Sequence, residues 1–212
     1  MKEENLTPKD YLGLAIEAGI GAIPVIGGPV QTLYFGKQNE KRFKRIENFY
    51  ASLNEDLDTI TDRIGEIENF QTNRDQLFGI IESINDEIEK ARTQSKLQYY
   101  KTLYINCILN INNSFWDEEE YFLEILNRIT PLQIEAITFL SSHPGFQKGL
   151  NKPNVSQFLF DGSLNILVDL GVLEPSILSL TFIKGGEGRQ EMAYKLSDLG
   201  IRFVDTVLRP IV

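Results

Sequence analysis

Residues 164–174 read LNILVDLGVLE, and this stretch shows where a helix stops and a strand-rich region begins. A short apolar segment, Val155–Phe160, leads to a helix expected over about Gly162–Leu170. Gly171 ends the helix, because glycine readily takes the left-handed conformation at a helix C-terminus. The apolar Val172 follows it in the order that a Schellman cap prefers.

A β-hairpin and a final helix follow this stop. Residues 178–183 and 191–196 alternate apolar and polar side chains, and GGEG at 185–188 supplies the turn between them. Ser197 is placed to cap the last helix. The apolar positions of that helix are Phe203, Val207 and the series Ile201, Val204 and Leu208, which steps by three and four.

Upstream of the hairpin, helix-start signals set the order of the elements. Thr130 to Gln133 form a capping box with proline at the first helical position, and Ser114 marks an earlier helix. The order of helix, short helix, helix, hairpin and helix is typical of a winged helix-turn-helix module. LNILVDLGVLE and YKLSDLGIRFVDTVL (194–208) resemble the recognition helix, wing and closing helix of bacterial winged-helix domains.

The N-terminal half carries a heptad seam. From residue 43 onward, apolar residues step by three and four without a break, and charged residues occupy the remaining faces. The pattern predicts one long helix, roughly Gln31–Glu68, that needs partner helices. The predicted helix-packing seam consists of Phe43, Ile46, Tyr50, Leu53, Leu57, Ile60, Ile64 and Ile67.

Two further helices are predicted before residue 113. Asn73 could cap the first, and a phase change near Thr93–Ser95 separates it from the second. The three helices could form an antiparallel bundle or an oligomeric coiled coil. The predicted fold class is therefore mainly α: a helical bundle or coiled coil over 1–113, then a winged-helix-like domain with one β-hairpin over 114–212.

Residues 18–30 read AGIGAIPVIGGPV and raise three alternatives. A phosphate-binding loop is disfavoured, because no Lys with Ser or Thr follows the glycines. Residues 18–36 carry no charge, but Pro24 and Pro29 would break a single spanning helix. We favour a helix-break-helix corner, with a re-entrant or interfacial membrane element as the alternative. The residues of this membrane or corner element are Ile20, Ile23, Ile26 and Val30.

Composition points to an ordinary globular protein. The chain has 212 residues, is 42% hydrophobic and is 24% charged, so it can bury a sizeable core in one domain or two. A single cysteine, Cys107, cannot form an internal disulfide, and the mixed charges of MKEENLTPKD do not form a secretory signal. We expect a cytoplasmic location, with peripheral membrane association left open.

The charge pattern disfavours a nucleic-acid partner. The formal net charge is -9, and residues 155–183 contain no Lys or Arg, whereas Asp161, Asp169 and Glu174 would approach a polyanion. A recognition helix on DNA needs cationic and amide groups for phosphates and base edges. We therefore expect protein contacts from this module and keep a DNA-binding transcription regulator as an alternative.

No residue set indicates catalysis. His143 stands at a helix end beside Pro144, and Cys107 lies on an inward helix face without a basic neighbour. Asp117 to Glu120 could suggest a metal site, but carboxylates in a first helical turn are also stabilised by the helix dipole. We predict a non-enzymatic protein with no catalytic residue, cofactor, metal ion or small-molecule substrate.

Several stretches together resemble a known family. They are IPVIGG (23–28), KRFKRIENFYASLNEDL (41–57), KLQYYKTLYINCIL (96–109), DEEEYFLEILNRITPLQIEAITFL (117–140) and the winged-helix ending. Their order is similar to that of small bacterial proteins of the abortive-infection alpha type. The resemblance implies a part in phage resistance, through protein contacts or membrane damage, and it implies no enzyme activity or site residues.

Three hypotheses about function follow from the sequence. The first is a bacterial interaction or regulatory protein that binds a protein partner or associates with itself. The second is a membrane effector that uses residues 11–35. The third is a winged-helix transcription regulator, which requires a positive surface on an acidic chain.

Overall fold

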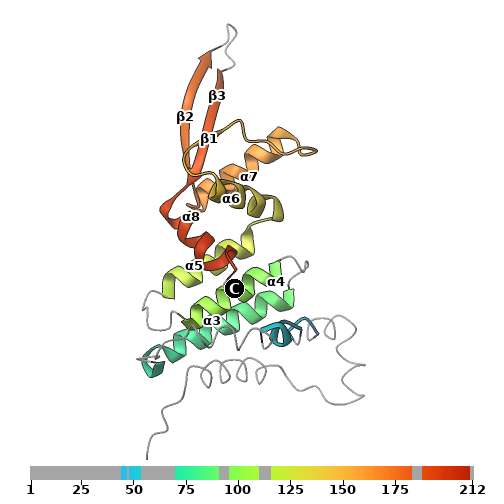
Figure 1. Ribbon diagram of the computed structural model, residues 1–212, viewed down its shortest axis with the longest axis vertical. Helices are drawn as coiled ribbons and strands as arrows, with labels where there is room; N and C mark the ends of the chain where they lie inside the picture. Colours follow the sequence, from blue (N-terminus) through green and yellow to red (C-terminus); the bar gives the residue numbers. More distant parts are fainter. Residues whose placement is uncertain are drawn as a thin grey trace, which may run out of the picture. The chain divides into compact units, whose positions relative to one another are not determined.

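The computed structural model of this chain describes residues 44–46, 48–53, 70–90, 96–109, 116–182 and 188–210. These residues are mainly helical and include one small antiparallel sheet of three strands (Figure 1). The chain divides into an N-terminal unit, Met1–Glu124 with Pro210–Val212, and a C-terminal unit, Ile125–Arg209. The predicted class is confirmed at this level: mainly helical, with a β-hairpin.

Helices α3 (Phe70–Lys90) and α4 (Leu97–Leu109) pack together in the N-terminal unit. The apolar positions of α3 repeat at steps of three and four, so they share one face. α3 begins before Asn73, so the predicted capping role of Asn73 is wrong. The buried residues of this face are Leu77, Ile80, Ile81, Ile84 and Ile88.

An aromatic cluster joins the helical residues 48–53 to α4. The rings of Phe49, Tyr50 and Tyr104 meet edge to face, with centroids 5.5, 5.9 and 6.1 Å apart. All three side chains are buried, and the Tyr50 hydroxyl donates to Oδ1 of Asn85 on α3 at 2.8 Å. Edge-to-face pairs of this kind add about 0.5–1.5 kcal/mol each beyond area burial.

Part of the predicted seam belongs to this cluster. Ile46, Tyr50 and Leu53 are buried at 3%, 2% and 0% exposure, and the residues around them are helical. The seam residues Phe43, Leu57, Ile60, Ile64 and Ile67 lie outside the described residues. The full length of the helix and its coiled-coil character therefore stay predictions.

Helix α5 (Trp116–Arg128) begins in the N-terminal unit and continues into the C-terminal unit. The predicted domain boundary, between Asn113 and Ser114, lies outside the described residues. That boundary stays a prediction.

The C-terminal unit contains four further helical segments and all three strands (Figure 1). In chain order they are α6 (Pro131–Ser142), β1 (Gln147–Lys148), α7 (Gln157–Asp169), β2 (Leu173–Phe182), β3 (Gly188–Leu196), α8 (Asp198–Phe203) and the π-helical segment η2 (Val204–Leu208). Its core is formed by apolar residues of α6, α7, the sheet and the last helix, including Ile137, Leu164, Leu167, Val172, Ala193, Phe203 and Val207.

The strand β3 lies between β1 and β2. β2 pairs antiparallel with β3 along its length, with a register shift between Ile177 and Ser179 that marks a β-bulge. β1 pairs only with Ala193 and Tyr194 of β3. The observed β2 and β3 are longer than the predicted strands, and the sequence pattern does not predict β1.

The turn after α7 confirms the predicted Schellman cap. Gly171 has a φ of +70° and donates its N–H to the Val168 carbonyl at 2.8 Å, while Val172 donates to the Leu167 carbonyl at 2.9 Å. These are the two hydrogen bonds of that motif. The chain thereby reverses direction and enters β2.

The start of α8 is fastened to this turn. The Ser197 hydroxyl caps α8 by accepting from the Gly200 N–H at 2.9 Å, as predicted, and it donates to the Gly171 carbonyl at 2.5 Å. The Ser197 N–H donates to the Val172 carbonyl at 3.0 Å. Gly200 lies so close to Val172 that a Cβ would overlap its carbonyl oxygen.

Two alanine substitutions should change the free energy of unfolding in opposite directions. Gly200→Ala inserts a methyl group against the Val172 backbone, and we expect a loss of about 1–3 kcal/mol. Gly162→Ala in α7 meets nothing within 4 Å, and we expect a gain of about 0.5–1 kcal/mol because alanine is favoured in helices. Urea unfolding followed by circular dichroism measures both, and effects of the same sign would contradict this packing.

The thiol of Cys107 should be inert in the folded chain. Its side chain is fully buried on α4, and burial, followed by the charge of Glu119, raises the pKa of the thiol. Little thiolate is then present at neutral pH, and reagents cannot reach it. We expect Ellman's reagent to react far more slowly with the native chain than with the chain in denaturant. Equal rates would show that this core is open.

Candidate protein-contact surface

Helix α7 turns one face toward the core of the C-terminal unit. Ser156 caps its start, with the hydroxyl accepting from the Leu159 N–H at 3.3 Å. Phe160, Leu164 and Leu167 are buried, and their steps of four and three keep them on one face of the helix. The other faces of α7 are left outside this core.

Three apolar side chains of α7 are exposed. Phe158 is 91% exposed, Leu159 58% and Ile166 46%. Phe158, Gly162 and Ile166 follow one another at steps of four, so they share a face. Gly162 is exposed and a Cβ there would meet nothing within 4 Å, so the helix backbone is accessible between the larger side chains. We call Phe158, Leu159, Gly162 and Ile166 the α7 surface.

The sequence pattern does not indicate this surface. It predicts an apolar segment over 155–160 before a helix from about Gly162, and that boundary is wrong because α7 begins at Gln157. Two signals could have located the earlier start: a serine in the capping position, and the helical spacing of Phe160 with Leu164 and Leu167.

The segment that carries the α7 surface is acidic or neutral. Residues 155–183 contain no Lys or Arg, and Asp161 and Asp169 are exposed on the helix. Asp161 accepts from Nε2 of Gln157 at 2.8 Å, which keeps its carboxylate beside the first turn of the helix. Burial, and then the charge of Asp161, raise the pKa of Tyr194. A polyanion would therefore meet repulsion here, whereas an apolar or basic protein segment would not.

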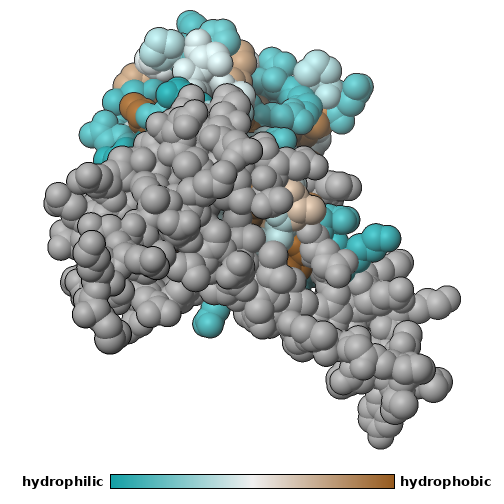
Figure 2. Space-filling model, turned by 60° about the horizontal axis from the view of Figure 1, so that its bottom comes forward, coloured by the Kyte–Doolittle hydropathy of each residue, from teal (hydrophilic) through white to brown (hydrophobic). Residues whose placement is uncertain are grey.

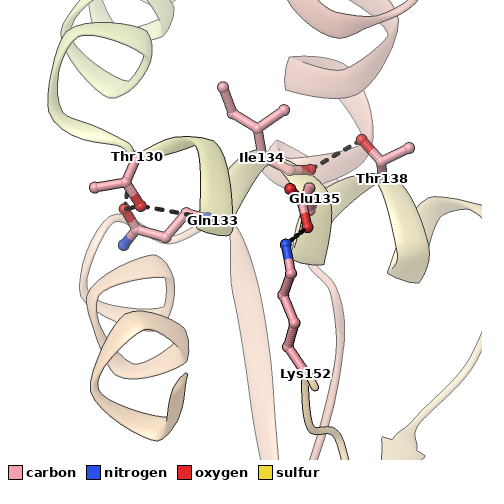
Figure 3. Close-up of polar contacts among 6 residues, drawn as sticks. All are labelled: Thr130, Gln133, Ile134, Glu135, Thr138 and Lys152. Atoms are coloured by element: carbon pink, nitrogen blue, oxygen red, sulfur yellow. Dashed lines mark hydrogen bonds and ion pairs between the residues drawn. The ribbon is translucent and has the colours of Figure 1, made fainter. Parts of the chain in front are cut away.

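A capping box begins α6 (Figure 3). The Gln133 N–H donates to the Thr130 hydroxyl at 3.4 Å, and Oε1 of Gln133 accepts from the Thr130 N–H at 2.8 Å, so the predicted box is confirmed. Nε2 of the same Gln133 donates to the Ser163 carbonyl at 3.1 Å, and this buried side chain ties α6 to α7.

A pocket of about 340 Å³ lies between α6 and the segment that follows β1. Glu135 and Lys152 line it and form an ion pair, drawn in Figure 3. Both side chains are solvent-accessible, so the pair contributes at most about 1 kcal/mol to stability. The apolar residues of the pocket are Leu132, Ala136, Phe139, Leu150 and Phe160.

Phe160 connects this pocket to α7, because its ring lines the pocket while its neighbours Phe158 and Leu159 are exposed. Figure 2 shows that hydrophobic areas on one face of the described chain are small and separated by hydrophilic ones. Single exposed apolar residues are normal on protein surfaces, whereas contiguous exposed apolar patches mark interaction sites. The α7 surface, with three exposed apolar side chains on one helix, is the candidate contact site.

The residues considered for catalysis or metal binding make contacts within the fold. The ring of His143 stacks on Phe139 with centroids 4.2 Å apart, and its Nδ1 lies 2.8 Å from the Phe139 carbonyl oxygen. Asp117, Glu118 and Glu119 occupy the first turn of α5. Burial raises the pKa of Glu119. Within the described ranges, no three His, Cys, Asp or Glu side chains are grouped to hold a metal ion.

The predicted membrane or corner element cannot be compared with these surfaces. Ile20, Ile23, Ile26 and Val30 lie outside the described residues. Among the helices that the structure does describe, none is long and apolar enough to cross a membrane.

Comparisons with protein-family models, curated proteins and solved structures found no match for this chain. No family is therefore assigned, and the resemblance to abortive-infection alpha proteins stays a prediction.

Alanine substitutions at Phe158 and Phe160 should separate the two faces of α7. Phe160 is 6% exposed, so Phe160→Ala should lower the free energy of unfolding by about 3–5 kcal/mol. Phe158→Ala removes the same atoms from a side chain already in water, and we expect a change within about 0.5 kcal/mol. Urea unfolding measures both variants. A large loss for Phe158→Ala would mean that α7 is rotated from the orientation described.

Proposed function

We propose that this chain is a non-enzymatic interaction or regulatory protein, and that the α7 surface is where its C-terminal unit contacts a partner protein. The observation that carries the proposal is the exposure of Phe158, with Leu159 and Ile166 beside it, on a helix segment without cations. Aromatic residues that anchor in a partner's pocket dominate the energy of many interfaces. The open backbone at Gly162 would let a partner approach closely.

We further propose that the C-terminal unit is a winged-helix-like module. Support comes from the chain order of α5, α6, α7, the β2–β3 hairpin and α8. In such a module α7 would take the place of the recognition helix and the hairpin that of the wing. Winged helices serve protein contacts as well as DNA, so the fold alone does not select the partner.

The charges on α7 favour a protein over DNA as that partner. A helix in the major groove presents Arg, Lys, Asn or Gln to bases and is flanked by cations on phosphates. α7 offers Gln157 and Asn165, but also Asp161 and Asp169, and it carries no cation. A transcription regulator is therefore the second candidate, supported by element order and opposed by charge.

The setting of this function is proposed from the resemblance to abortive-infection alpha proteins, which suggests phage defence in a bacterial cytoplasm. The helices of the N-terminal unit would then bury the heptad seam against one another as a bundle, one of the two arrangements that the sequence leaves open. A membrane effector remains the further alternative from sequence, and its residues 11–35 lie outside the described part of the chain.

Site-specific photocrosslinking in bacterial cells tests the partner proposal. A photoreactive amino acid replaces Asn165, which is exposed on α7 near Ile166. We expect a protein adduct that disappears when Phe158→Asp is added, because a charge in the anchor position prevents burial in the partner. Ile201→Asp is the matched control, because Ile201 is 48% exposed in the same unit but lies on α8. The adduct formed at position 165 should persist when Ile201→Asp is added.

Binding of the purified partner then gives a magnitude. An anchoring aromatic residue contributes 2 kcal/mol or more, so Phe158→Asp should weaken the complex by about 30-fold or more in calorimetry. An adduct that survives Phe158→Asp would overturn the α7 surface as the contact site. Tight binding to duplex DNA, with affinity falling steeply as salt rises, would instead favour the transcription regulator.

A further inference from the structure

The outer edge of β2 has no strand partner within the described residues. The sheet order is β1-β3-β2, so β2 has β3 on one side only. Alternate N–H and C=O groups along its ten residues are therefore directed away from the sheet. An exposed strand edge of this kind is a template for pairing with another strand.

Two apolar side chains in the middle of β2 are also exposed. Ile177 is 56% exposed and Leu178 is 48% exposed. Consecutive side chains of a strand point to opposite faces of the sheet, although the bulge between Ile177 and Ser179 perturbs this alternation. Figure 1 shows the far ends of β2 and β3 extending beyond the helices of this unit. β1 reaches only Ala193 and Tyr194, so it does not support this part either.

A two-stranded ribbon in this situation is weakly stable. An isolated hairpin is marginal in water, and a third strand or a packed helix is normally needed. The hairpin is anchored at its base by β1 and by the fastened turn between α7 and α8. Its distal part gains most from another strand along β2.

The sequence of β2 leaves its edge open to pairing. From Pro175 to Phe182 it reads PSILSLTF, with no charged residue. Edge strands are commonly protected by Lys, proline or a bulge. Pro175 blocks pairing at the base of β2 because it has no N–H, and the bulge bends the strand at Leu178, but no charge opposes an approaching strand.

A second copy of this chain fits the edge by self-complementarity. Two β2 strands related by a two-fold axis run antiparallel, and each contributes the same uncharged segment, so the net charge of -9 places no like charges opposite one another there. Among the side chains that the structure describes next to this segment, Glu191 on β3 is charged, and it accepts from the Ser179 hydroxyl at 3.3 Å. The two β3 strands that carry Glu191 would lie about 14 Å apart, which exceeds the Debye length of about 8 Å at physiological salt.

We propose that β2 pairs antiparallel with β2 of a second copy, through residues 176–182, to form a continuous four-stranded sheet in the order β3-β2-β2-β3. The ladder hydrogen bonds supply the association. Pairing over 176–182 is centred on Ser179, so position 178 of each copy lies opposite position 180 of the other. This surface shares no residue with the α7 surface.

Sedimentation of the full chain with Leu178→Lys tests the pairing. We expect the unaltered chain to be a dimer and Leu178→Lys to lose the dimer over the same concentration range, because each lysine would lie one residue from the two-fold axis, near the lysine of the other copy. Ile201→Lys is the matched control, since Ile201 is also 48% exposed, and it should remain dimeric. A monomeric unaltered chain, a dimeric Leu178→Lys chain, or loss of the dimer in both variants would each overturn the proposal.

Cysteine scanning gives a second readout that does not depend on a destabilising change. Single cysteines are placed in turn from Ser176 to Phe182, and the fully buried Cys107 does not interfere. In an antiparallel two-fold pair one position lies opposite itself, and each residue away from it adds about 7 Å to the separation. Oxidation should give a covalent dimer at one position and little on either side of it. Uniformly low cross-linking along the strand would contradict a β2–β2 ladder.

Discussion

The close approach of α8 to the turn after α7 is the constraint on which the C-terminal unit depends. The carbonyls of Gly171 and Val172 lie in the turn after α7, and Ser197 donates its hydroxyl to the first and its N–H to the second. Gly200 makes this possible, because any larger residue would meet the Val172 backbone. One serine therefore holds the turn after α7, begins α8 and closes the base of the hairpin between them.

This junction also determines which side chains of the C-terminal unit are exposed. The reversal at Gly171 fixes the direction in which β2 leaves α7, and the Gln133 bond to the Ser163 carbonyl fixes α6 on the inner side of the same helix. Because Phe160, Leu164 and Leu167 are buried in the core, Phe158 and Ile166 on the other side of α7 stay exposed among the described residues of this unit. Their exposure is a consequence of the packing rather than of local flexibility.

The features predicted correctly from the sequence are those that depend on a few neighbouring residues. The Thr130–Gln133 box, the Gly171 cap and the Ser197 cap involve residues within a few positions of each other, so no tertiary knowledge is needed. The start of α7 and the strand β1 were missed for the opposite reason. Phe158 looks like a core residue by composition, and a two-residue strand exists only because Tyr194 and Ala193 lie beside it. Exposure of an aromatic residue cannot be read from a pattern that assumes apolar residues are inside.

The two proposed surfaces together would make the molecule bivalent. If β2 joins two copies, each dimer presents two α7 surfaces, because the residues of the two surfaces are separate. Binding of one α7 surface then raises the effective concentration of the second for a repetitive or dimeric partner, and modest affinity at each site becomes strong attachment overall. The two surfaces would also respond differently to salt. Self-association through the uncharged β2 edge would be nearly independent of salt, whereas binding of a basic partner beside the acidic residues of α7 would weaken as salt rises.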